Sequence, residues 1–461
     1  MKGAYLFFMK TWVTKINQKE SVAALKRIVS IPSVNIGDGV TYPPFGQAIA
    51  DCLAEVLSIC KTLGMSTYSD PEGFYGYADY GQGEELVAVL CHLDVVPAGD
   101  LNLWDTHPFN AVVKDGKLLG RGSQDDKGPT IAALYGFKAV VDEGINFTKR
   151  IRFVFGTDEE TLWRCMDRYN LKEEQPTMGF VPDSSFPVTY AEKGLLQIKL
   201  IGPGSSDFSL VCGGAFNVVP DRASYQGNDA KIVSEKLAEI NVNQNFDGQL
   251  VTVKGKAVHA STAEQGINAI NQLAKGLVHV HPHPMVQFLA EKVGDETNGF
   301  SIFGEIQDEM TGELTFNVAS ICIDENNSEI KLDLRIPISF PIEDLVETLK
   351  NVVAPYGLNY QEFDHVAGLY VPKESELVQT LMTIYQSKTG DKTWPLTSGG
   401  ATYARTMQNM VAFGARFPTT EGLAHQSNEG ISLDELFQAM DIYAETIFQL
   451  CCRTKKTHSY L

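Results

Sequence analysis

The sequence lacks any long apolar run and has few basic residues for its size. No stretch approaches the roughly 20 apolar residues of a membrane helix, and the apolar residues 4–9 are too short for the core of a secretory signal. Lys and Arg number 38 against 57 Asp and Glu, a formal net charge of -19, so we expect no basic face for nucleic acid or an anionic membrane. The expectation is a cytoplasmic protein with neither as partner.

Paired cysteines are lacking too. The eight cysteines are scattered, contain no CxxC spacing, and include the adjacent Cys451 and Cys452. In a long chain this pattern is typical of reduced, mostly buried thiols and excludes a disulfide framework. Internal repeats and low-complexity linkers are absent as well, so the chain is expected to be globular.

The chain does have length and an alternating pattern of strands and helices. Its 461 residues, 44% of them hydrophobic, can bury a large core and indicate two domains or three. Apolar runs at 84–96 and 150–160 predict buried strands, and 128–144 predicts a helix that begins near Pro129 and ends near Gly144. Strands buried on both faces predict an α/β fold with a mixed, largely parallel sheet flanked by helices.

The pattern changes after about residue 191. Alternating runs at 195–202 and 248–261 predict strands, and 267–278 predicts an amphipathic helix. The α/β pattern returns after about Pro372. We therefore expect one domain built from residues 1–191 and 373–461, with a second domain, 192–372, inserted into it.

The segment "VFGTDEET", residues 154–161, places Asp158, Glu159 and Glu160 directly behind an apolar run. Adjacent carboxylates near a low-dielectric core repel one another, and one of them loses its charge unless a cation compensates. The sequence therefore predicts a cation at this strand end.

Other acids and histidines also follow predicted strands. His92 and Asp94 lie two apart at a strand end, where α/β sheets build their sites, although such a pair also occurs without metal. Asp125 and Asp126 occupy a glycine-bounded turn before the Pro129 helix, and Asp126 is equally suited to capping that helix.

Asp183 and His425 complete the candidate set, one after a short apolar run and the other in a polar loop. Carboxylates mixed with two imidazoles suit Zn²⁺ or Mn²⁺, whereas Ca²⁺ and Mg²⁺ prefer oxygen alone. The expected cation is one divalent metal ion, or two.

Five motifs in this order, HLDVVP, GRGSQDDKGP, GTDEE, the lone Asp183 and AHQSNE, resemble the dinuclear metallopeptidase family of aminoacylase, carboxypeptidase G and carnosinase. The resemblance is closest to its PepV-type bacterial dipeptidases. It spans nearly the whole chain, because the insertion point and "GKAVHAST", residues 255–262, match too. It implies metal-dependent hydrolysis of dipeptides with a free N-terminal amine, and an inserted α+β lid of two similar subdomains.

The resemblance also implies the metal ligands. His92 and Asp183 would bind one ion, Glu160 and His425 the other, and Asp125 would bridge the two. A cis peptide bond to the residue after Asp125 is also expected, a conformation that persists only where a site demands it.

By the same resemblance, Glu159 would be the general base and Asp94 would orient His92, as carboxylates do for metal-bound histidines. His259, from the inserted domain, would stabilise the oxyanion. The ions would lower the pKa of a water molecule and polarise the scissile carbonyl.

Substrate recognition is assigned by resemblance alone. Asn217 and Arg335 resemble lid residues that hold the peptide carboxylate, with an ion pair to Asp333 or Glu329 as the alternative role for Arg335. Residues 398–405, "SGGATYAR", resemble a glycine-rich substrate loop, although Ser398 stands where a third glycine is expected. The loop residues implied in binding are Ser398, Gly399, Gly400, Tyr403 and Arg405.

A histidine cluster is excluded from the site. His279, His281 and His283 are spaced by two, as a metal site on one strand face would be. Two prolines and the absence of nearby acids predict a solvated loop instead.

Assembly and alternative activities complete the expectations. An insert of about 180 residues is long enough for two α/β units, which by resemblance implies a monomer that supplies His259 in cis. An N-acyl amino acid deacylase or desuccinylase would use the same metals, and a non-catalytic binding protein could keep the same fold. A dinuclear phosphoesterase also uses His and Asp clusters, but the resemblance does not support it.

Overall fold

The computed structural model describes residues 10–452, and the chain divides into two compact units. The first comprises Met1–Tyr190, Val371–Leu396 and Thr402–Leu461, and the second comprises Ala191–Tyr370 and Thr397–Ala401. We expected the short segment Thr397–Ala401 in the domain of residues 1–191 and 373–461, whereas it groups with the inserted unit. No helix in the described range is long and apolar enough to cross a membrane.

The first unit is built on a mixed sheet. Its four central strands are parallel, and antiparallel strands flank them on both sides. The central strands β3 and β6 are almost entirely buried, which explains their continuous apolar sequences. The expected mixed sheet is confirmed, but it is parallel only at its centre, because the pairings of β1 with β2, β2 with β6 and β22 with β9 are antiparallel. In spatial order the strands are β1 (Ser66–Ser69), β2 (Tyr75–Tyr80), β6 (Arg150–Gly156), β3 (Leu86–His92), β7 (Met178–Val181), β22 (Met410–Phe413) and β9 (Val188–Glu192).

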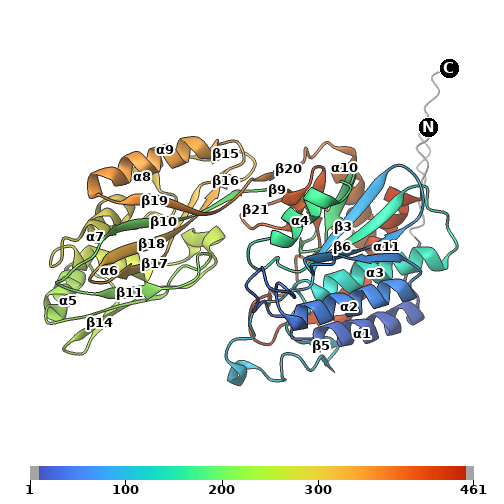
Figure 1. The fold of residues 1–461 in the computed structure, drawn as a ribbon, viewed down its shortest axis with the longest axis horizontal. Helices are drawn as coiled ribbons and strands as arrows, with labels where there is room; N and C mark the ends of the chain where they lie inside the picture. The colour runs from blue at the N-terminus through green and yellow to red at the C-terminus, as the bar shows by residue number, and fades with distance from the viewer. Residues whose placement is uncertain (1–9, 453–461) are drawn as a thin grey trace, which may run out of the picture. The chain divides into compact units, whose positions relative to one another are not determined.

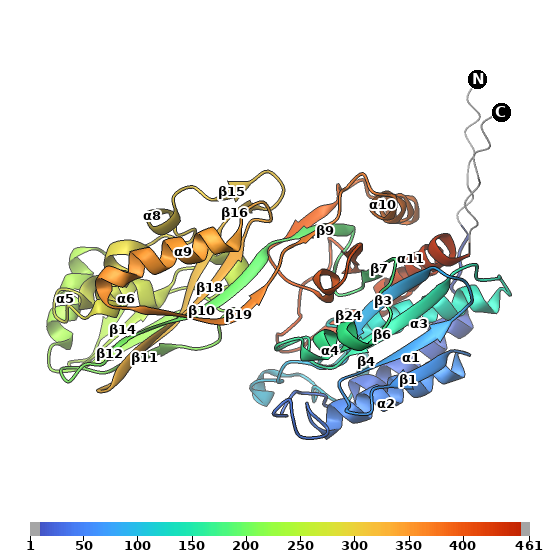
Figure 2. The same ribbon diagram turned by 45° about the horizontal axis from the view of Figure 1, so that its top comes forward.

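Helices cover this sheet. In both ribbon views α1, α2 and α3 lie side by side along it (Figures 1 and 2). The predicted helix is α3, which begins two residues before Pro129 and is buried on nearly all sides because it packs against both α1 and α11. The helices are α1 (Lys15–Val29), α2 (Gln47–Thr62), α3 (Lys127–Asp142), α4 (Arg164–Lys172), α10 (Glu376–Thr389) and α11 (Leu433–Cys451).

Short strand pairs shape the loops of the first unit. β24 (Gly430–Ser432) pairs with β5 (Lys117–Leu119), which pairs in turn with β4 (Val112–Lys114). β23 (Ala415–Arg416) runs parallel to β8 (Ser184–Ser185). These pairings join C-terminal segments to loops formed early in the chain.

The second unit is an α+β domain, as expected for the insert. Two groups of helices pack in this unit. α5 and α6 pack against its three-stranded sheet of β12, β14 and β13, and α9 packs beside β19 and α8. Both groups share one hydrophobic cluster that draws on residues from Leu196 to Leu358. Its five-stranded antiparallel sheet runs β11 (Leu210–Gly213), β17 (Thr315–Ile323), β18 (Asn327–Ile336), β10 (Gly194–Pro203) and β19 (Asn359–Val366). Its smaller sheet and helices are β12 (Arg222–Gln226), β14 (Leu250–Lys254), β13 (Gln244–Phe246), α5 (Ala230–Glu239), α6 (Ala269–Leu277), α7 (Pro284–Phe288), α8 (Phe300–Phe303) and α9 (Ile342–Val353).

The histidine-rich segment of this unit is a turn and loop, as expected, but it is only partly solvated: His279 is exposed, whereas His281 and His283 are packed. His281 Nε2 lies 2.8 Å from the Tyr225 hydroxyl, and its ring stacks on Phe208 at 4.4 Å. His283 is buried, caps α7, and its Nε2 donates to the Pro203 carbonyl at 3.0 Å. Among the described residues, no cluster with metal-ligand geometry includes these histidines.

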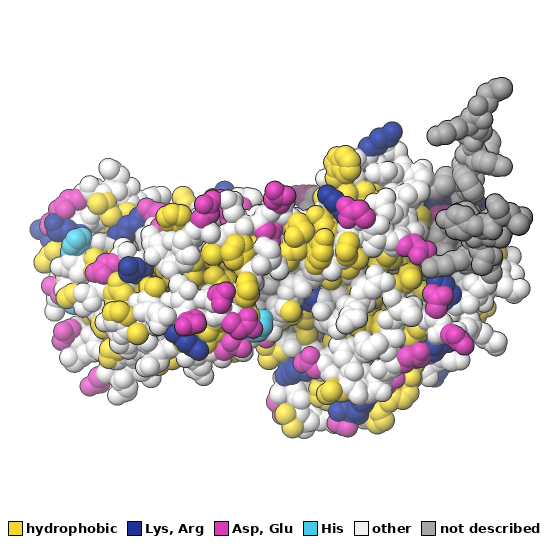
Figure 3. Space-filling model, turned by 90° about the horizontal axis from the view of Figure 1, so that it is seen from above, with side chains coloured by type: hydrophobic (Ala, Val, Ile, Leu, Met, Phe, Trp, Pro, Cys, Tyr) yellow, Lys and Arg dark blue, Asp and Glu magenta, His cyan; other side chains and the backbone are white. Residues whose placement is uncertain are grey.

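Surface charge follows the composition. On the face of the described residues shown in Figure 3, Lys and Arg side chains are scattered among Asp and Glu and form no continuous basic area.

Candidate metal centre

The predicted metal ligands of the first unit lie at one edge of its sheet. His92 ends β3, the pair Glu159 and Glu160 follows β6, and Asp183 follows β7. Because β3, β6 and β7 are parallel, their carboxyl ends meet at the same edge. Asp125 joins them from the loop that leads into α3.

Asp125 lies between two imidazoles. Its Oδ1 is 2.9 Å from His92 Nε2, and its Oδ2 is 3.1 Å from His425 Nε2. Each imidazole has a second carboxylate nearby: Asp183 Oδ2 is 3.7 Å from His92 Nε2, and Glu160 Oε1 is 3.0 Å from His425 Nε2. The peptide bond that follows Asp125 is cis, as the resemblance implied.

The donor atoms converge closely enough to hold metal. Two sets, one of His92, Asp125 and Glu160 and the other of His92, Glu159 and Asp183, have ligand atoms within 4.8 Å of one another. Imidazole nitrogen mixed with carboxylate oxygen fits Zn²⁺ or Mn²⁺. Since Glu159 belongs to the second set, its position is compatible with ligation as well as with a role as base.

The bare site carries unfavourable electrostatics. Burial raises the pKa of Glu159 and of Asp183 well above the ordinary carboxyl value, and the charge of Asp125 adds to both shifts. Burial alone would lower the pKa of His92, but hydrogen bonds to Asp125 and Asp94 outweigh it and raise that pKa well above its usual value. A divalent cation would relieve this repulsion and allow the carboxylates to ionise.

The three adjacent acids after β6 have different surroundings. Buried Asp158 accepts hydrogen bonds from Arg164 Nε at 2.7 Å and Nη2 at 2.8 Å, so a guanidinium compensates its charge. Glu160 faces His425. Glu159, between them, has neither contact and keeps its carboxylate in the cluster.

Asp94 supports the site through two groups. Its backbone carbonyl accepts a hydrogen bond from His92 Nδ1 at 2.9 Å, which leaves Nε2 facing the carboxylates. Its carboxylate accepts the backbone N–H groups of Glu159 and Glu160, each at 3.0 Å. The carboxylate itself lies 3.6 Å from Nδ1, so the carbonyl orients His92 and the side chain fixes the turn that carries the two glutamates.

Asp126 does not cap α3 with its side chain, although it stands at the N-cap position. Its carboxylate instead accepts the backbone N–H of His92 and the Thr130 hydroxyl, both at 3.1 Å. Burial raises the pKa of Asp126 to about 7. The residue thus ties the start of α3 to the end of β3.

Comparison with known proteins identifies the family of the chain. Residues 88–449 match the family model described as peptidase family M20/M25/M40. The chain belongs to this family. Family membership makes it a metallopeptidase that depends on bound metal.

Relatives of this M20 chain cover nearly its full length. A protein of Staphylococcus epidermidis named "Putative dipeptidase" is 34% identical, with 95% of this chain and 99% of the relative covered. A Staphylococcus aureus protein of the same description is 35% identical over the same shares. Solved structures share the fold: human carnosine dipeptidase 1, at 16% identity, has a TM-score of 0.58 and covers 93% of this chain and 95% of its own. A Saccharomyces cerevisiae dipeptidase, at 14% identity, reaches 0.61 with 95% and 98% covered.

Sequence reasoning missed one buried ion pair of the M20 site. Glu429 and Arg121 are both buried, and Arg121 Nη1 donates to Glu429 Oε2 at 2.6 Å. The Glu429 carboxylate also accepts the backbone N–H groups of Gly122 at 3.1 Å, Gln124 at 2.8 Å and Asp125 at 3.3 Å. Glu429 therefore joins the His425 segment to the Asp125 loop. The sequence pattern that could have revealed it is the acid near the end of "GLAHQSNEG".

The second unit brings its own predicted residues together. The Asn217 carbonyl accepts the N–H of the residue after His259 at 2.9 Å. His259 Nδ1 lies 2.7 Å from the Ser261 hydroxyl, and a Cβ added to Gly399 would lie 3.0 Å from Ser261 Cβ. Arg335 Nη1 donates to the Gly399 carbonyl at 3.3 Å. These contacts gather Asn217, His259, Arg335 and the Ser398–Gly400 loop in one region of this unit.

Two predicted substrate residues have other surroundings. Tyr403 is buried in the first unit, and its hydroxyl lies 3.0 Å from Cys165 Sγ, which favours packing behind His92 over substrate contact. Arg405 lies over the Trp163 ring at 6.0 Å. Arg335 Nε contacts Asp333 Oδ1 at 2.7 Å, so the ion pair considered as its alternative role is present.

Proposed function

We propose that this M20 metallopeptidase is a dinuclear dipeptidase. One observation carries the proposal: Asp125 presents one carboxylate oxygen to each of two imidazoles, and each imidazole has its own second carboxylate. A bridging carboxylate flanked by two such half-sites is the arrangement that two ions require. His92 and Asp183 would hold one ion, Glu160 and His425 the other, and Asp125 both.

The proposed ions are Zn²⁺ or Mn²⁺, because the donors mix imidazole and carboxylate. When bound, they supply a water of lowered pKa and Lewis-acid polarisation of the scissile carbonyl. The chain holds this donor set in place through Asp94, Asp126 and Glu429, whose carboxylates bind the backbone beside the ligands.

Glu159 is the proposed general base. It is the member of the acidic turn that pairs with neither Arg164 nor His425, so its carboxylate stays available for proton transfer. It would take a proton from the attacking water and then give that proton to the leaving amine nitrogen.

The second unit supplies the remaining roles in this proposal. His259 would donate a hydrogen bond to the oxyanion, and Asn217, Arg335 and the Ser398–Gly400 loop would bind the peptide. Their assignment rests on the sequence motifs, and their grouping within this unit supports it. The names of the relatives support dipeptides as the substrate class.

The testing experiment measures amino acid release by metal-stripped protein after addition of Zn²⁺ or Mn²⁺. The panel contains Ala-Ala, Ala-Ala-Ala and N-acetyl-alanine. Metal-dependent cleavage of Ala-Ala with weak cleavage of the tripeptide is expected. Cleavage of N-acetyl-alanine alone would assign a deacylase, and metal binding without any turnover would assign a binding protein.

A further inference from the structure

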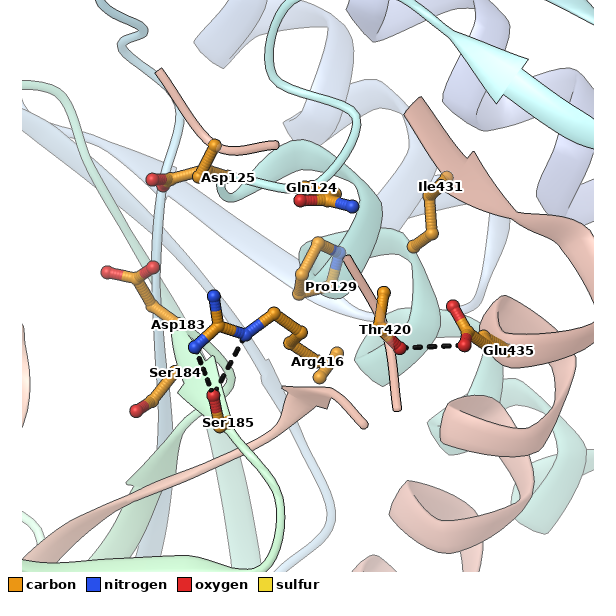
Figure 4. Close-up of a pocket in the computed structure, with 12 residues that line it drawn as sticks. Gln124, Asp125, Pro129, Asp183, Ser184, Ser185, Arg416, Thr420, Ile431 and Glu435 are labelled. Atoms are coloured by element: carbon orange, nitrogen blue, oxygen red, sulfur yellow. Dashed lines mark hydrogen bonds between the residues drawn. The ribbon is translucent and has the colours of Figure 1, made fainter. Parts of the chain in front are cut away.

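A pocket of about 180 Å³ adjoins the metal centre within the first unit. Asp125 and Asp183 form part of its wall, so it shares two carboxylates with the proposed metal site (Figure 4). Ser185 and Arg416 form another part. Because β8 and β23 run parallel with these two residues in register, the fold places the serine hydroxyl beside the guanidinium.

Arg416 is held in the pocket by a neutral partner. Its Nε and Nη2 donate to Ser185 Oγ at 3.0 and 2.8 Å, and Figure 4 shows the guanidinium turned toward Asp183 and Ser185. Within the described residues, no carboxylate lies within 4.0 Å of this guanidinium. A guanidinium has five N–H donors, so several stay available to a ligand.

The chain also leaves room for the guanidinium. A Cβ added at Gly422 would lie 2.5 Å from Arg416 Nη1, so a larger residue there would make the end of the arginine side chain move. Glycine at this position therefore permits the observed placement of Arg416.

The charge balance favours an anionic ligand. The proposed metal ions would offset the charges of Asp125 and Asp183. Glu435 lies at the opposite side of the pocket, where it accepts the Thr420 hydroxyl at 2.7 Å (Figure 4). Among the described residues that line the pocket, Arg416 is then the one cation, and it has no carboxylate partner.

We propose that Arg416 and Ser185 bind a substrate carboxylate beside the scissile bond, so that dipeptides with an acidic side chain are preferred. A guanidinium matches a carboxylate in shape and charge. A cavity of about 150 Å³ can hold a benzene molecule, so the pocket of about 180 Å³ has room for one short acidic side chain. This inference rests on the proposed dipeptidase function and names its substrate class.

The experiment compares each acidic dipeptide with its uncharged isostere. kcat/KM is measured for Asp-Ala, Asn-Ala, Ala-Asp and Ala-Asn with the wild type, Arg416→Gln and Arg416→Lys. Arg416→Gln should lower the acid-to-amide ratio by roughly tenfold to a hundredfold at one of the two positions, and Arg416→Lys should retain part of it. The affected position identifies the residue that enters the pocket.

Controls separate this effect from structural damage. Arg27→Gln, a change to an exposed arginine in α1 that pairs with Glu55, should leave the ratio unchanged. Metal content is measured for every variant, because loss of an ion would lower all rates together.

The peptide C-terminus is the other source of a carboxylate. If Arg416→Gln instead lowers the ratio for Ala-Ala over Ala-Ala amide, Arg416 binds that terminal carboxylate, and the preference for acidic side chains is overturned. Unchanged ratios in every pair, with an active wild type, would overturn the inference alone. A wild type that cleaves no dipeptide would reject the proposed function together with it.

Discussion

Glu159 is the residue on which the proposed chemistry depends most. Glu159→Gln keeps the shape of the side chain but cannot take a proton, so kcat should fall by about 10²- to 10⁴-fold. Metal content should stay at the wild-type value, measured by elemental analysis after gel filtration. Loss of one ion per chain would instead show that Glu159 is a ligand, which its place in the donor cluster allows. Glu20→Gln, on the exposed part of α1, is the matched control.

Substitutions of Asp125 and of His425 should affect a different number of bound metal ions. Asp125 faces both imidazoles, so Asp125→Asn should weaken both ions. His425 faces only one half of the site, so His425→Ala should weaken one ion and leave the other bound. Calorimetric titration of the stripped proteins with Zn²⁺ resolves the two binding steps. Equal loss of both ions in the two variants would contradict the bridging role.

The protonation of His425 gives a pH prediction. In the metal-free site burial lowers its pKa, but hydrogen bonds to Asp125 and Glu160 outweigh this and raise the pKa to about 11. Its imidazole therefore stays protonated at pH 8, where an ordinary histidine of pKa about 6.5 is neutral, and metal must displace that proton. Metal affinity should increase with pH from 8 towards 11. Calorimetry in buffers of different ionisation enthalpy should detect proton release at pH 8, and less release from His425→Ala.

At the scale of elements, the Arg121–Glu429 ion pair connects the loop that carries Asp125 to the loop that carries His425. Glu429→Gln leaves a buried guanidinium without its counter-charge, which costs about 3–5 kcal/mol in comparable cases. The free energy of unfolding should fall by that order, measured by denaturant titration, and Zn²⁺ affinity should weaken because the Asp125 loop loses its anchor. Glu235→Gln, which breaks the exposed pair with Lys231, should cost less than about 1 kcal/mol. Similar losses for both changes would contradict the anchoring role.

Most residues of the candidate site could be predicted because they lie next to the ends of predicted strands and helices. His92, Asp125, Glu160 and Asp183 each follow or precede an element with a clear apolar pattern, and parallel strands bring such residues to one edge. The Arg121–Glu429 pair joins loops that are far apart in the sequence, and no local period marks such a contact. The ion pair of Asp158 with Arg164 was not predicted either, because Arg164 lies in the following helix and its side chain extends back to Asp158.

At the scale of the molecule, the predicted monomer can be tested by mixing inactive variants. If each chain supplies its own His259, a mixture of Glu159→Gln and His259→Ala should stay as inactive as its components. If His259 acts across a dimer, mixed pairs would regain one intact site and activity would return. Rates are measured after co-refolding of the two variants, with sedimentation to determine the oligomeric state.

The chain path between the units was the hardest feature to predict. Changes in the pattern of apolar and polar residues marked the start and end of the insert. Thr397–Ala401, however, belongs to the second unit, although both segments that flank it belong to the first. Five residues are too few to show a change of composition or period. Their assignment follows from contacts such as that of Arg335 with the Gly399 carbonyl, which only the folded chain reveals.

The position of β22 sets an order for folding on the ribosome. β22, Met410–Phe413, lies between β7 and β9, so the first unit cannot close its sheet until Phe413 has been translated. The hydrophobic cluster of the second unit ends at Leu358 and leaves the exit tunnel earlier. The inserted unit should therefore bury its core first. The apolar strands β3 and β6 are synthesised before it but stay in an incomplete sheet until β22 is added, so they should depend longest on chaperones.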